Sequence, residues 1–459
     1  MKKKLFASSI VIINLTIQSI SAQIIAGGGS HNLANCSSGL IDAWGYNLYG
    51  QIGDGTTTDR HTPVPVSLIT GVTAVSAGYE FSLALKNDGT VWSWGWNQYG
   101  QIGDGTNVER HTPVQVNGLT GIIKMTAGPD LGLALKSDGT FWGWGYNTNG
   151  QLGDGTTANH TSPVQISFSN ITEFTAGYRH TLILKSDSTV WASGANQFGQ
   201  LGNGTTTDSH THIQVNLLSG ITAIKAGANH SLAIKDDSTV WAWGWNLNGQ
   251  LGDGTTTTQT TPIQISTLSG VRAVAAGAAQ SFALKYDGTL WAWGVNGLGQ
   301  VGDGTNIERH YPVQTLSGVS QIFAGGDHAI AIKTDGTVWA WGYNAYGQIG
   351  DGTTTDRWSP VLVTGLCPLP TLETENNFLG SEMTISPNPV SDNLYVSSYN
   401  PLNDIALVVY DLAGKKILIK YFTGIDNKIT VNVGHLKPGI YFIRLNGQQA
   451  ERAIKFIKM

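Results

Sequence analysis

Histidine and aspartate recur in this sequence at positions that could bind a metal or transfer protons. One column of histidines contains His31, His180, His230 and His328, and a second contains His61, His111, His210 and His310. Asp–Gly pairs recur at a similar interval, at Asp54, Asp104, Asp154, Asp253, Asp303 and Asp351. A zinc ion needs three or four ligands at one place, whereas one residue per repeat spreads the histidines along the repeats. The Asp–Gly pairs also lack the ligand spacing of a calcium loop. We therefore expect structural roles and turn chemistry, and no metal site.

Sequence motifs of common catalytic sites are missing. The chain has no Gly-x-Ser-x-Gly, no His-Glu-x-x-His and no phosphate-binding loop. We expect no enzymatic activity and no cofactor. An extracellular enzyme acting on polysaccharide is the alternative, and it would require a cleft that contains acids with perturbed pKa values.

The composition predicts many short strands joined by turns. Glycine accounts for 59 of the 459 residues, and only 12% of the residues are charged. Glycine, threonine, asparagine and tryptophan are poor or middling helix formers, so a helical bundle is disfavoured. Between the three lysines at the start and Thr371, residues 5–370 carry 14 Lys and Arg against 23 Asp and Glu, a net charge of −9. A nucleic-acid partner is therefore not expected, because such proteins present a basic face.

One motif recurs seven times. It begins at Trp44 and restarts at Trp94, Trp144, Ser193, Trp243, Trp293 and Trp341. Within one unit, residues 73–77, 81–86, 90–94 and 113–116 have the composition of strands, and Asp88–Gly89 has that of a hairpin turn. Seven such units predict an all-β, seven-bladed β-propeller.

The chain enters and leaves the repeat midway through a unit. We expect one blade to be built from both ends of the repeat region, which would hide sheet edges. Cys36 and Cys367 would then both lie in that closing blade. In an oxidising compartment such a pair can form a disulfide, and the alternative is two unrelated thiols.

The repeat resembles a known family. Residues 226–252 read Ala-Gly-x-x-His-Ser-Leu-Ala-Ile-Lys, then Thr-Val-Trp-Ala-Trp-Gly-x-Asn-x-x-Gly-Gln-Leu-Gly, with Ser238 where glycine is expected. This pattern is similar to the regulator of chromosome condensation repeat, and the resemblance implies a seven-bladed propeller over 23–367. Bacterial relatives that inhibit β-lactamases imply protein binding. The eukaryotic namesake implies guanine-nucleotide exchange as an alternative.

The two ends of the chain predict export. Residues 1–22 have the basic start, apolar middle and small-residue end of a secretory signal. We expect no transmembrane segment after its removal, and a monomer. Residues 368–380 have the composition of a linker.

Residues 381–459 predict a small β-sandwich. They contain Ser386-Pro-Asn-Pro, Asp411-Leu-Ala-Gly-Lys-Lys416 and Lys455-Phe-Ile-Lys458. These segments resemble the type A C-terminal sorting domain of the type IX secretion system of Bacteroidetes. The resemblance implies handling by that machinery and a secreted or surface-attached product. The alternative is a carbohydrate- or protein-binding sandwich that stays attached.

Aromatic residues gather in two loops of each repeat that must meet at one end of a blade. The hairpin turn joins two strands at one end, so the residues before the first and after the second meet at the other. We predict a partner-binding face there for an extracellular protein or glycan, because aromatic residues dominate interface hot spots. The alternative is that the rings are extra core. The predicted residues are Tyr46, Tyr49, Trp96, Tyr99, Tyr146, Tyr178, Phe198, Trp245, Tyr343 and Tyr346.

Overall fold

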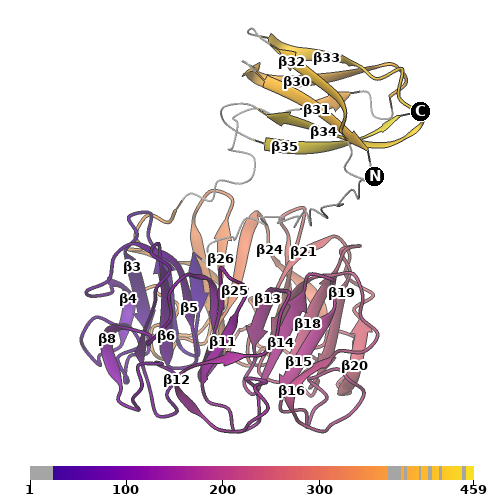
Figure 1. The fold of residues 1–459 in the computed structure, drawn as a ribbon. Helices are drawn as coiled ribbons and strands as arrows, with labels where there is room; N and C mark the ends of the chain where they lie inside the picture. The colour runs from indigo at the N-terminus through magenta and orange to yellow at the C-terminus, as the bar shows by residue number, and fades with distance from the viewer. Residues whose placement is uncertain are drawn as a thin grey trace, which may run out of the picture. The chain divides into compact units, whose positions relative to one another are not determined.

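The protein is built from β-strands, as predicted, and a computed structural model describes residues 24–370 and, after them, 384–386, 390–402, 405–411, 416–422, 426–446 and 451–458. The chain divides after Pro370 into two compact units (Figure 1). The predicted signal segment 1–22 and most of the predicted linker lie outside the described residues. Among the described residues, no helix is both long and apolar enough to span a bilayer.

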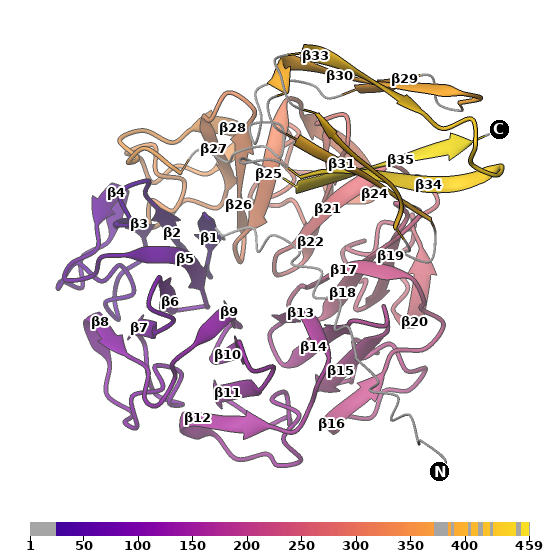
Figure 2. The same ribbon diagram turned by 45° about the horizontal axis from the view of Figure 1, so that its top comes forward.

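The first unit is a ring of seven antiparallel sheets, each with four strands that follow one another along the chain. Figure 2 views the ring obliquely. The first strands of successive blades contact one another around its centre. The first four blades are β1 (Ile25–Gly27), β2 (His31–Asn35), β3 (Ile41–Gly45), β4 (Arg60–Pro65); β5 (Val72–Ala77), β6 (Phe81–Lys86), β7 (Val91–Gly95), β8 (Arg110–Gln115); β9 (Ile122–Ala127), β10 (Leu131–Lys136), β11 (Phe141–Gly145), β12 (His160–Ile166); and β13 (Ile171–Ala176), β14 (His180–Lys185), β15 (Val190–Gly194), β16 (Ser209–Gln214). The last three are β17 (Ile221–Ala226), β18 (His230–Lys235), β19 (Val240–Gly244), β20 (Gln259–Gln264); β21 (Val271–Ala276), β22 (Gln280–Lys285), β23 (Leu290–Gly294), β24 (Arg309–Leu316); and β25 (Val319–Ala324), β26 (His328–Lys333), β27 (Val338–Gly342), β28 (Arg357–Leu362).

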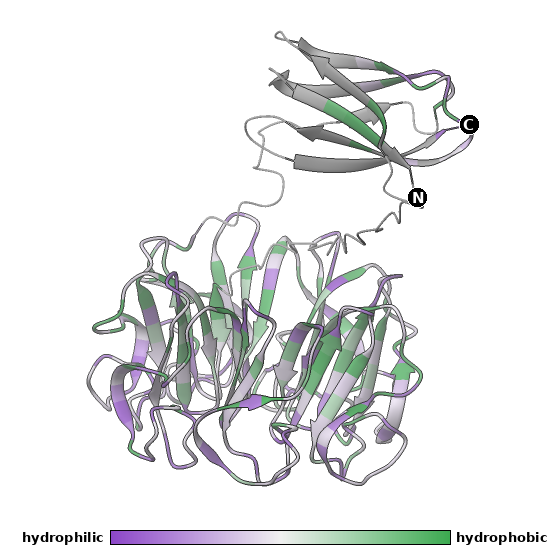
Figure 3. Cartoon of the chain, in the orientation of Figure 1, coloured by the Kyte–Doolittle hydropathy of each residue, from purple (hydrophilic) through white to green (hydrophobic). Residues whose placement is uncertain are grey.

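Burial within a blade follows its sequence pattern. The second strand is apolar along most of its length and buried on both faces, as in β6. The fourth strand is partly exposed, as in β4, and Figure 3 shows hydrophilic residues on strands at the rim. The predicted turn at Asp88 is confirmed, because its carboxylate accepts hydrogen bonds from the backbone and hydroxyl of Thr90. The Asp–Gly pairs have the same role: Asp54 accepts from the backbone of Thr56 and from Arg60 Nε.

A repeated hydrogen bond joins neighbouring blades. The indole Nε1 on the third strand of one blade donates to the backbone carbonyl of a glutamine in the preceding blade, as Trp94 does to Gln51 at 2.9 Å. Five further pairs repeat this bond at 2.8–3.0 Å: Trp44–Gln348, Trp144–Gln101, Trp243–Gln200, Trp293–Gln250 and Trp341–Gln300. All six indoles are fully buried, so the tryptophans stabilise the packing between blades.

The interface between the third and fourth blades departs from this pattern in a compensated way. Ser193 replaces the tryptophan, and its hydroxyl donates to the Gln151 carbonyl instead. His212 occupies the freed space: its imidazole faces Gly153, whereas the equivalent Gly202 faces the indole of Trp243. His212 also stands where the other six blades have proline. Burial lowers the pKa of His212 to about 4.

The first histidine column is structural, as expected. His31, His180 and His230 each place Nε2 within 3.0 Å of a serine hydroxyl on the next blade, and His328 bonds to Asn32 in the same way. Burial lowers the pKa of each imidazole to about 3 or 4. These histidines therefore stabilise the ring as neutral side chains.

The prediction that one blade is built from both ends of the repeat region is wrong. Residues 25–65 form a complete first blade, and residues 319–362 form a complete seventh. The inner strand β1 is only three residues long, so the first unit is shortened rather than halved.

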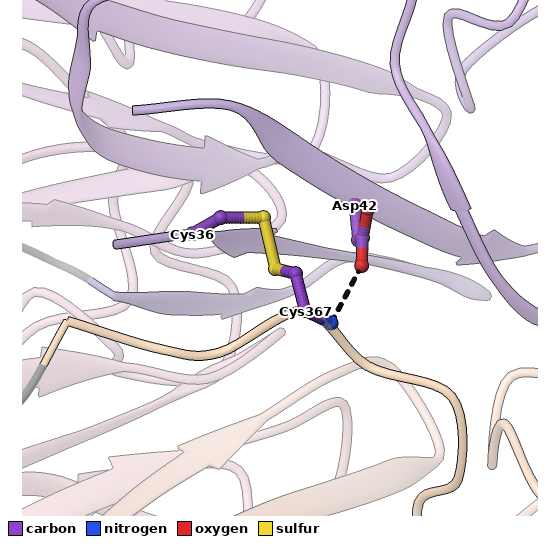
Figure 4. A group of neighbouring side chains, drawn as sticks. All are labelled: Cys36, Asp42 and Cys367. Atoms are coloured by element: carbon purple, nitrogen blue, oxygen red, sulfur yellow. Dashed lines mark hydrogen bonds between the residues drawn. A yellow bond between two sulfur atoms is a disulfide. The ribbon is translucent and has the colours of Figure 1, made fainter. Parts of the chain in front are cut away.

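A disulfide joins the first blade to the chain leaving the seventh (Figure 4). Cys36 lies in the turn after β2 and Cys367 follows β28, with their Cα atoms 5.7 Å apart. The backbone N–H of Cys367 donates to the Asp42 carboxylate at 2.8 Å, and Ser37 N–H donates to the Pro368 carbonyl. In the other six blades, the positions equivalent to Cys36 and Asp42 hold a lysine and a tryptophan, and the lysine lies over the tryptophan ring, as Lys86 does over Trp92. The first blade therefore replaces that pair with two residues that bond the returning chain.

The second unit has two antiparallel sheets, as expected for a small β-sandwich. Their strands are β29 (Thr384–Ser386), β30 (Asn393–Leu402), β33 (Asp426–Asn432), and β32 (Lys416–Phe422), β31 (Ile405–Asp411), β34 (Gly439–Asn446), β35 (Glu451–Lys458). Leu394 and Val431 of one sheet share an apolar cluster with Leu407 and Ile443 of the other.

Removing the disulfide should destabilise the ring. Replacing Cys36 and Cys367 with serine opens a loop of 331 residues, and we expect a loss of about 4 kcal/mol in the free energy of unfolding. Denaturant unfolding of oxidised wild type, reduced wild type and the double variant measures the loss. Equal midpoints for all three proteins would show that the covalent link contributes nothing.

Ser193 and His212 should be energetically coupled. Ser193→Trp alone overfills the interface and should cost about 2 kcal/mol. Adding His212→Pro restores the sequence of the other blades and should recover most of that cost, a coupling of about 1–3 kcal/mol. The double variant should also lose less stability between pH 6.5 and 4, because a buried imidazole that resists protonation favours unfolding as pH falls. Additive losses in a double-mutant cycle would contradict this compensation.

Candidate binding face

Two sets of loops meet at one end of the propeller, which we call the loop face. The short loops join the first and second strands of each blade at 28–30, 78–80, 128–130, 177–179, 227–229, 277–279 and 325–327. The long loops join the third and fourth strands at 46–59, 96–109, 146–159, 195–208, 245–258, 295–308 and 343–356. The backbone N–H of the first residue of each long loop donates to the backbone carbonyl of the third residue of the short loop. The bond from Trp96 to Glu80, for example, is 2.9 Å long. This bond therefore joins the short and the long loop in every blade.

Each long loop carries two outward positions, represented by Trp96 and Tyr99 in the second blade. A glycine precedes the first position: Gly95 has φ 108°, and a Cβ there would lie 2.6 Å from the Glu80 carbonyl oxygen. At the second position, the backbone N–H of Tyr99 donates to Oε1 of Gln101 at 3.0 Å. The equivalent glutamine accepts the same bond in every blade, and we call it the latch glutamine. The loop then packs against the fourth strand of the next blade, where Gly100 contacts Thr161. The second ring is thereby held close to the neighbouring blade.

Seven of the predicted rings form one continuous chain, which we call the aromatic arc. Successive ring centroids are 4.5–6.3 Å apart, within the range of favourable aromatic contact. The arc crosses the junction between the seventh and first blades and continues to the third. All its side chains are partly exposed. In order, they are Tyr343, Tyr346, Tyr46, Tyr49, Trp96, Tyr99 and Tyr146.

The other predicted rings lie outside this arc. Phe198 and Trp245 contact each other across the fourth and fifth blades, 5.6 Å apart. Tyr178 lies in a short loop with Arg179 over its ring, and it contacts Tyr79 at 6.3 Å. Sequence reasoning missed Tyr79, which is 46% exposed. The signal was available, because Tyr79 occupies the same column of the repeat as Tyr178.

Two carboxylates beside the arc have raised pKa values. Burial, followed by repulsion from Asp130 and Glu109, raises the pKa of Glu80 to about 7. Burial raises the pKa of Asp130 to about 6, although Arg179 opposes the shift. Burial, with Glu80 as the next cause, raises the pKa of Tyr46 to about 12. Neither Glu80 nor Asp130 forms a side-chain hydrogen bond or ion pair within residues 24–370.

Across the part of the chain that the structure describes, the one cluster of potential metal ligands is Cys36, Asp42 and Cys367. Its two sulfur atoms are joined in the disulfide, and Asp42 accepts the backbone N–H of Cys367. This cluster therefore serves to close the ring and does not fit a metal ion.

Comparison with protein families identifies both units. The RCC1-like domain matches residues 122–385, and the regulator of chromosome condensation (RCC1) repeat matches 38–85 and 88–135, with a further match at 72–101. The secretion system C-terminal sorting domain matches 384–459. No curated protein matches the chain.

Solved structures show the same propeller fold. Human WBSCR16 is 22% identical, with a TM-score of 0.64 over 71% of this chain and 94% of that chain. Prp20p from Saccharomyces cerevisiae is 23% identical, with a TM-score of 0.64 over 71% of this chain and 86% of its own. A chain in the structure of Kap60 bound to yeast RCC1 (Prp20) is 20% identical, with a TM-score of 0.66 over 79% and 89%.

These matches agree with the architecture described above. The sorting domain points to type IX secretion and to a secreted or surface-attached product. The RCC1-like match covers more than half of the chain, and the structure supplies the seven blades that the repeat predicts. The chain belongs to the RCC1-like propeller family and carries a C-terminal secretion sorting domain.

Proposed function

We propose that this secreted propeller is a binding module whose aromatic arc recognises an extracellular protein or glycan. The continuity of the arc is the observation that carries the proposal, since seven partly exposed rings contact one another in tilted and T-shaped pairs across four blades. Large exposed aromatic surfaces on soluble proteins usually mark interaction sites. Tyrosine and tryptophan are also the residues most enriched at binding hot spots.

Other blades keep the same loop hydrogen bonds without aromatic rings at these positions. The equivalent first position holds Ala195 in the fourth blade and Val295 in the sixth, and both keep the same backbone hydrogen bond to the short loop. Asn149 and Asn248 hold the second position and keep the bond to the latch glutamine. The fully buried tryptophans, such as Trp94, perform the packing between blades. A role in binding therefore explains the arc better than a role as extra core.

Nucleotide exchange has weaker support. Prp20p has described binding properties to Gsp1p and histones, but at 23% identity its likeness to this chain is one of fold. The sorting domain directs this protein out of the cell, away from intracellular GTPases. Catalysis has no supporting constellation among the side chains described above. We therefore favour binding over both alternatives.

Trimming the arc should remove binding without unfolding the protein. We expect Trp96→Ala with Tyr99→Ala to weaken capture of extracellular ligands at least tenfold and to cost less than about 2 kcal/mol of stability, because both rings are partly exposed. Wild type and variant, immobilised at equal density, would be compared for retention of the same proteins and glycans from the host's secreted and surface fractions. Tyr286→Ala is the control, since Tyr286 is 71% exposed in the turn after β22. Unchanged capture, or a stability loss of the about 3–5 kcal/mol typical of core aromatics, would overturn the proposal.

The raised pKa of Glu80 predicts a pH-dependent stability cost. A carboxyl group whose folded pKa is raised favours folding at low pH, and this contribution is lost as pH rises toward 7. Glu80→Gln should therefore stabilise the protein at pH 8 by about 1 kcal/mol, allowing for partial exposure, and the gain should disappear near pH 4. Thermal unfolding of both proteins across this pH range measures the difference. A variant less stable than wild type at pH 8 would show that Glu80 is a structural residue.

A further inference from the structure

We infer that the partner is a protein presenting an arginine- or lysine-rich segment, whose cationic side chains bind to the rings of the aromatic arc and to the carboxylates beside them. This inference rests on the proposed binding function and adds the chemical class of the partner. It is carried by three features: the distribution of charge, the pairing of the charged groups, and the absence of cations over the arc.

The net negative charge of the propeller lies on the loop face. The short loops, the long loops and the first residues of the fourth strands hold fourteen carboxylates and five basic side chains, a net charge of −9. The rest of residues 24–367 holds nine acidic and nine basic side chains and is neutral. The five basic residues on the loop face are Arg60, Arg110, Arg179, Arg309 and Arg357.

The five arginines of the loop face already contact other side chains of the propeller. Arg60, Arg110, Arg309 and Arg357 each pair with the Asp–Gly aspartate of their own loop. Arg179 lies over Tyr178, which is not a member of the arc, and its charge also acts on Asp130. Among the carboxylates beside the arc, Glu80 and Asp327 form no ion pair with a side chain of residues 24–370, whereas Asp130 is attracted by Arg179. Glu80 forms no side-chain hydrogen bond within residues 24–370, and Asp327 accepts only a 3.3 Å bond from Gln300.

The same chain shows what aromatic rings with cations look like. In six blades a lysine ammonium lies 4.6–5.6 Å from the ring centroid of an outer tryptophan, as Lys333 does over Trp339. Within residues 24–370, no lysine or arginine lies over any ring of the arc. The arc therefore combines rings that hold no cation of residues 24–370 with two carboxylates, Glu80 and Asp327, that have no ion pair there, which is an environment that favours guanidinium and ammonium groups.

Charge also argues against the other classes of ligand. Anionic glycans and nucleic acids would meet a field of the same sign. A neutral glycan would stack on the rings but would gain nothing from the net charge. A basic protein segment uses both features, and electrostatic attraction would speed its encounter with the face. Protein is therefore the favoured occupant, and a neutral glycan is an outcome of the test.

The experiment uses matched peptides and the full propeller with its disulfide intact. Short alternating peptides of glycine with arginine, lysine or citrulline would be titrated by fluorescence anisotropy, since citrulline keeps the planar group of arginine without its charge. We expect the arginine peptide to bind most tightly, the lysine peptide next and the citrulline peptide at least tenfold more weakly. Raising the salt from 50 to 300 mM should weaken binding of the arginine peptide about tenfold.

Variants of the chain locate the site. Glu80→Gln with Asp327→Asn should weaken the arginine peptide about tenfold, and Trp96→Ala should do the same at unchanged charge. Asp138→Asn with Asp237→Asn is the matched control, since it removes two carboxylates from the opposite end of the propeller and should have no effect. Equal losses in the two charge variants would show only diffuse attraction and overturn the inference.

The inference and the proposed function fail separately. Binding of neutral oligosaccharides such as cellohexaose or chitohexaose that Trp96→Ala abolishes, with no binding of the arginine peptide, would overturn the cationic partner and keep the binding face. Equal affinity for the arginine and citrulline peptides would also overturn it, because charge would then be irrelevant. Loss of ligand capture in the arc variant, tested above, concerns the proposed function alone.

Discussion

The structure depends on how each blade joins the next. A four-stranded sheet in this ring must bury both faces, and the tryptophan of one blade does so by packing beneath the long loop of the preceding blade and donating to its glutamine carbonyl. The same glutamine uses Oε1 to hold the backbone of the second outward position. The contact that closes each interface therefore also fixes the loop that carries the aromatic rings. On the proposed binding function, a partner would meet a surface that the packing between blades holds in place.

Closure of the ring follows the same rule with one addition. The junction between the seventh and first blades has the usual indole bond, from Trp44 to the Gln348 carbonyl. No strand is shared between the two ends of the repeat region, and the disulfide adds a covalent link, with the Asp42 contact beside it, to the hydrogen bonds between the two blades. The aromatic arc runs across this junction through Tyr346 and Tyr46. Continuity of the arc therefore depends on a closed ring, and export to an oxidising compartment favours that closure.

The sequence was sufficient for the fold because each unit repeats both its core and its turns. The spacing of tryptophans and the Asp–Gly turns predicted seven blades of four strands, although the fourth strand, expected at 113–116, begins three residues earlier at Arg110. It misplaced the closure, because a three-residue first strand has too little sequence to be distinguished from half a unit. The outward positions could be read from the hairpin topology, but contact between Tyr49 and Trp96 could not. That contact arises because the long loop of the first blade packs against the second blade, and such packing is a tertiary property. The exchange of tryptophan for Ser193 with His212 for proline was equally hidden, since it spans two blades.

The charge of the loop face became visible only once the loops were assigned to one end. The excess of acidic residues is evident in the sequence, but its segregation requires the topology. Hydrogen–deuterium exchange of the propeller with and without the arginine peptide tests the central claim most directly. The account predicts protection in the long loops 343–356, 46–59 and 96–109, and none in the turns at the opposite end. Protection at the opposite turns, or an exchange pattern unchanged at saturating peptide, would contradict it.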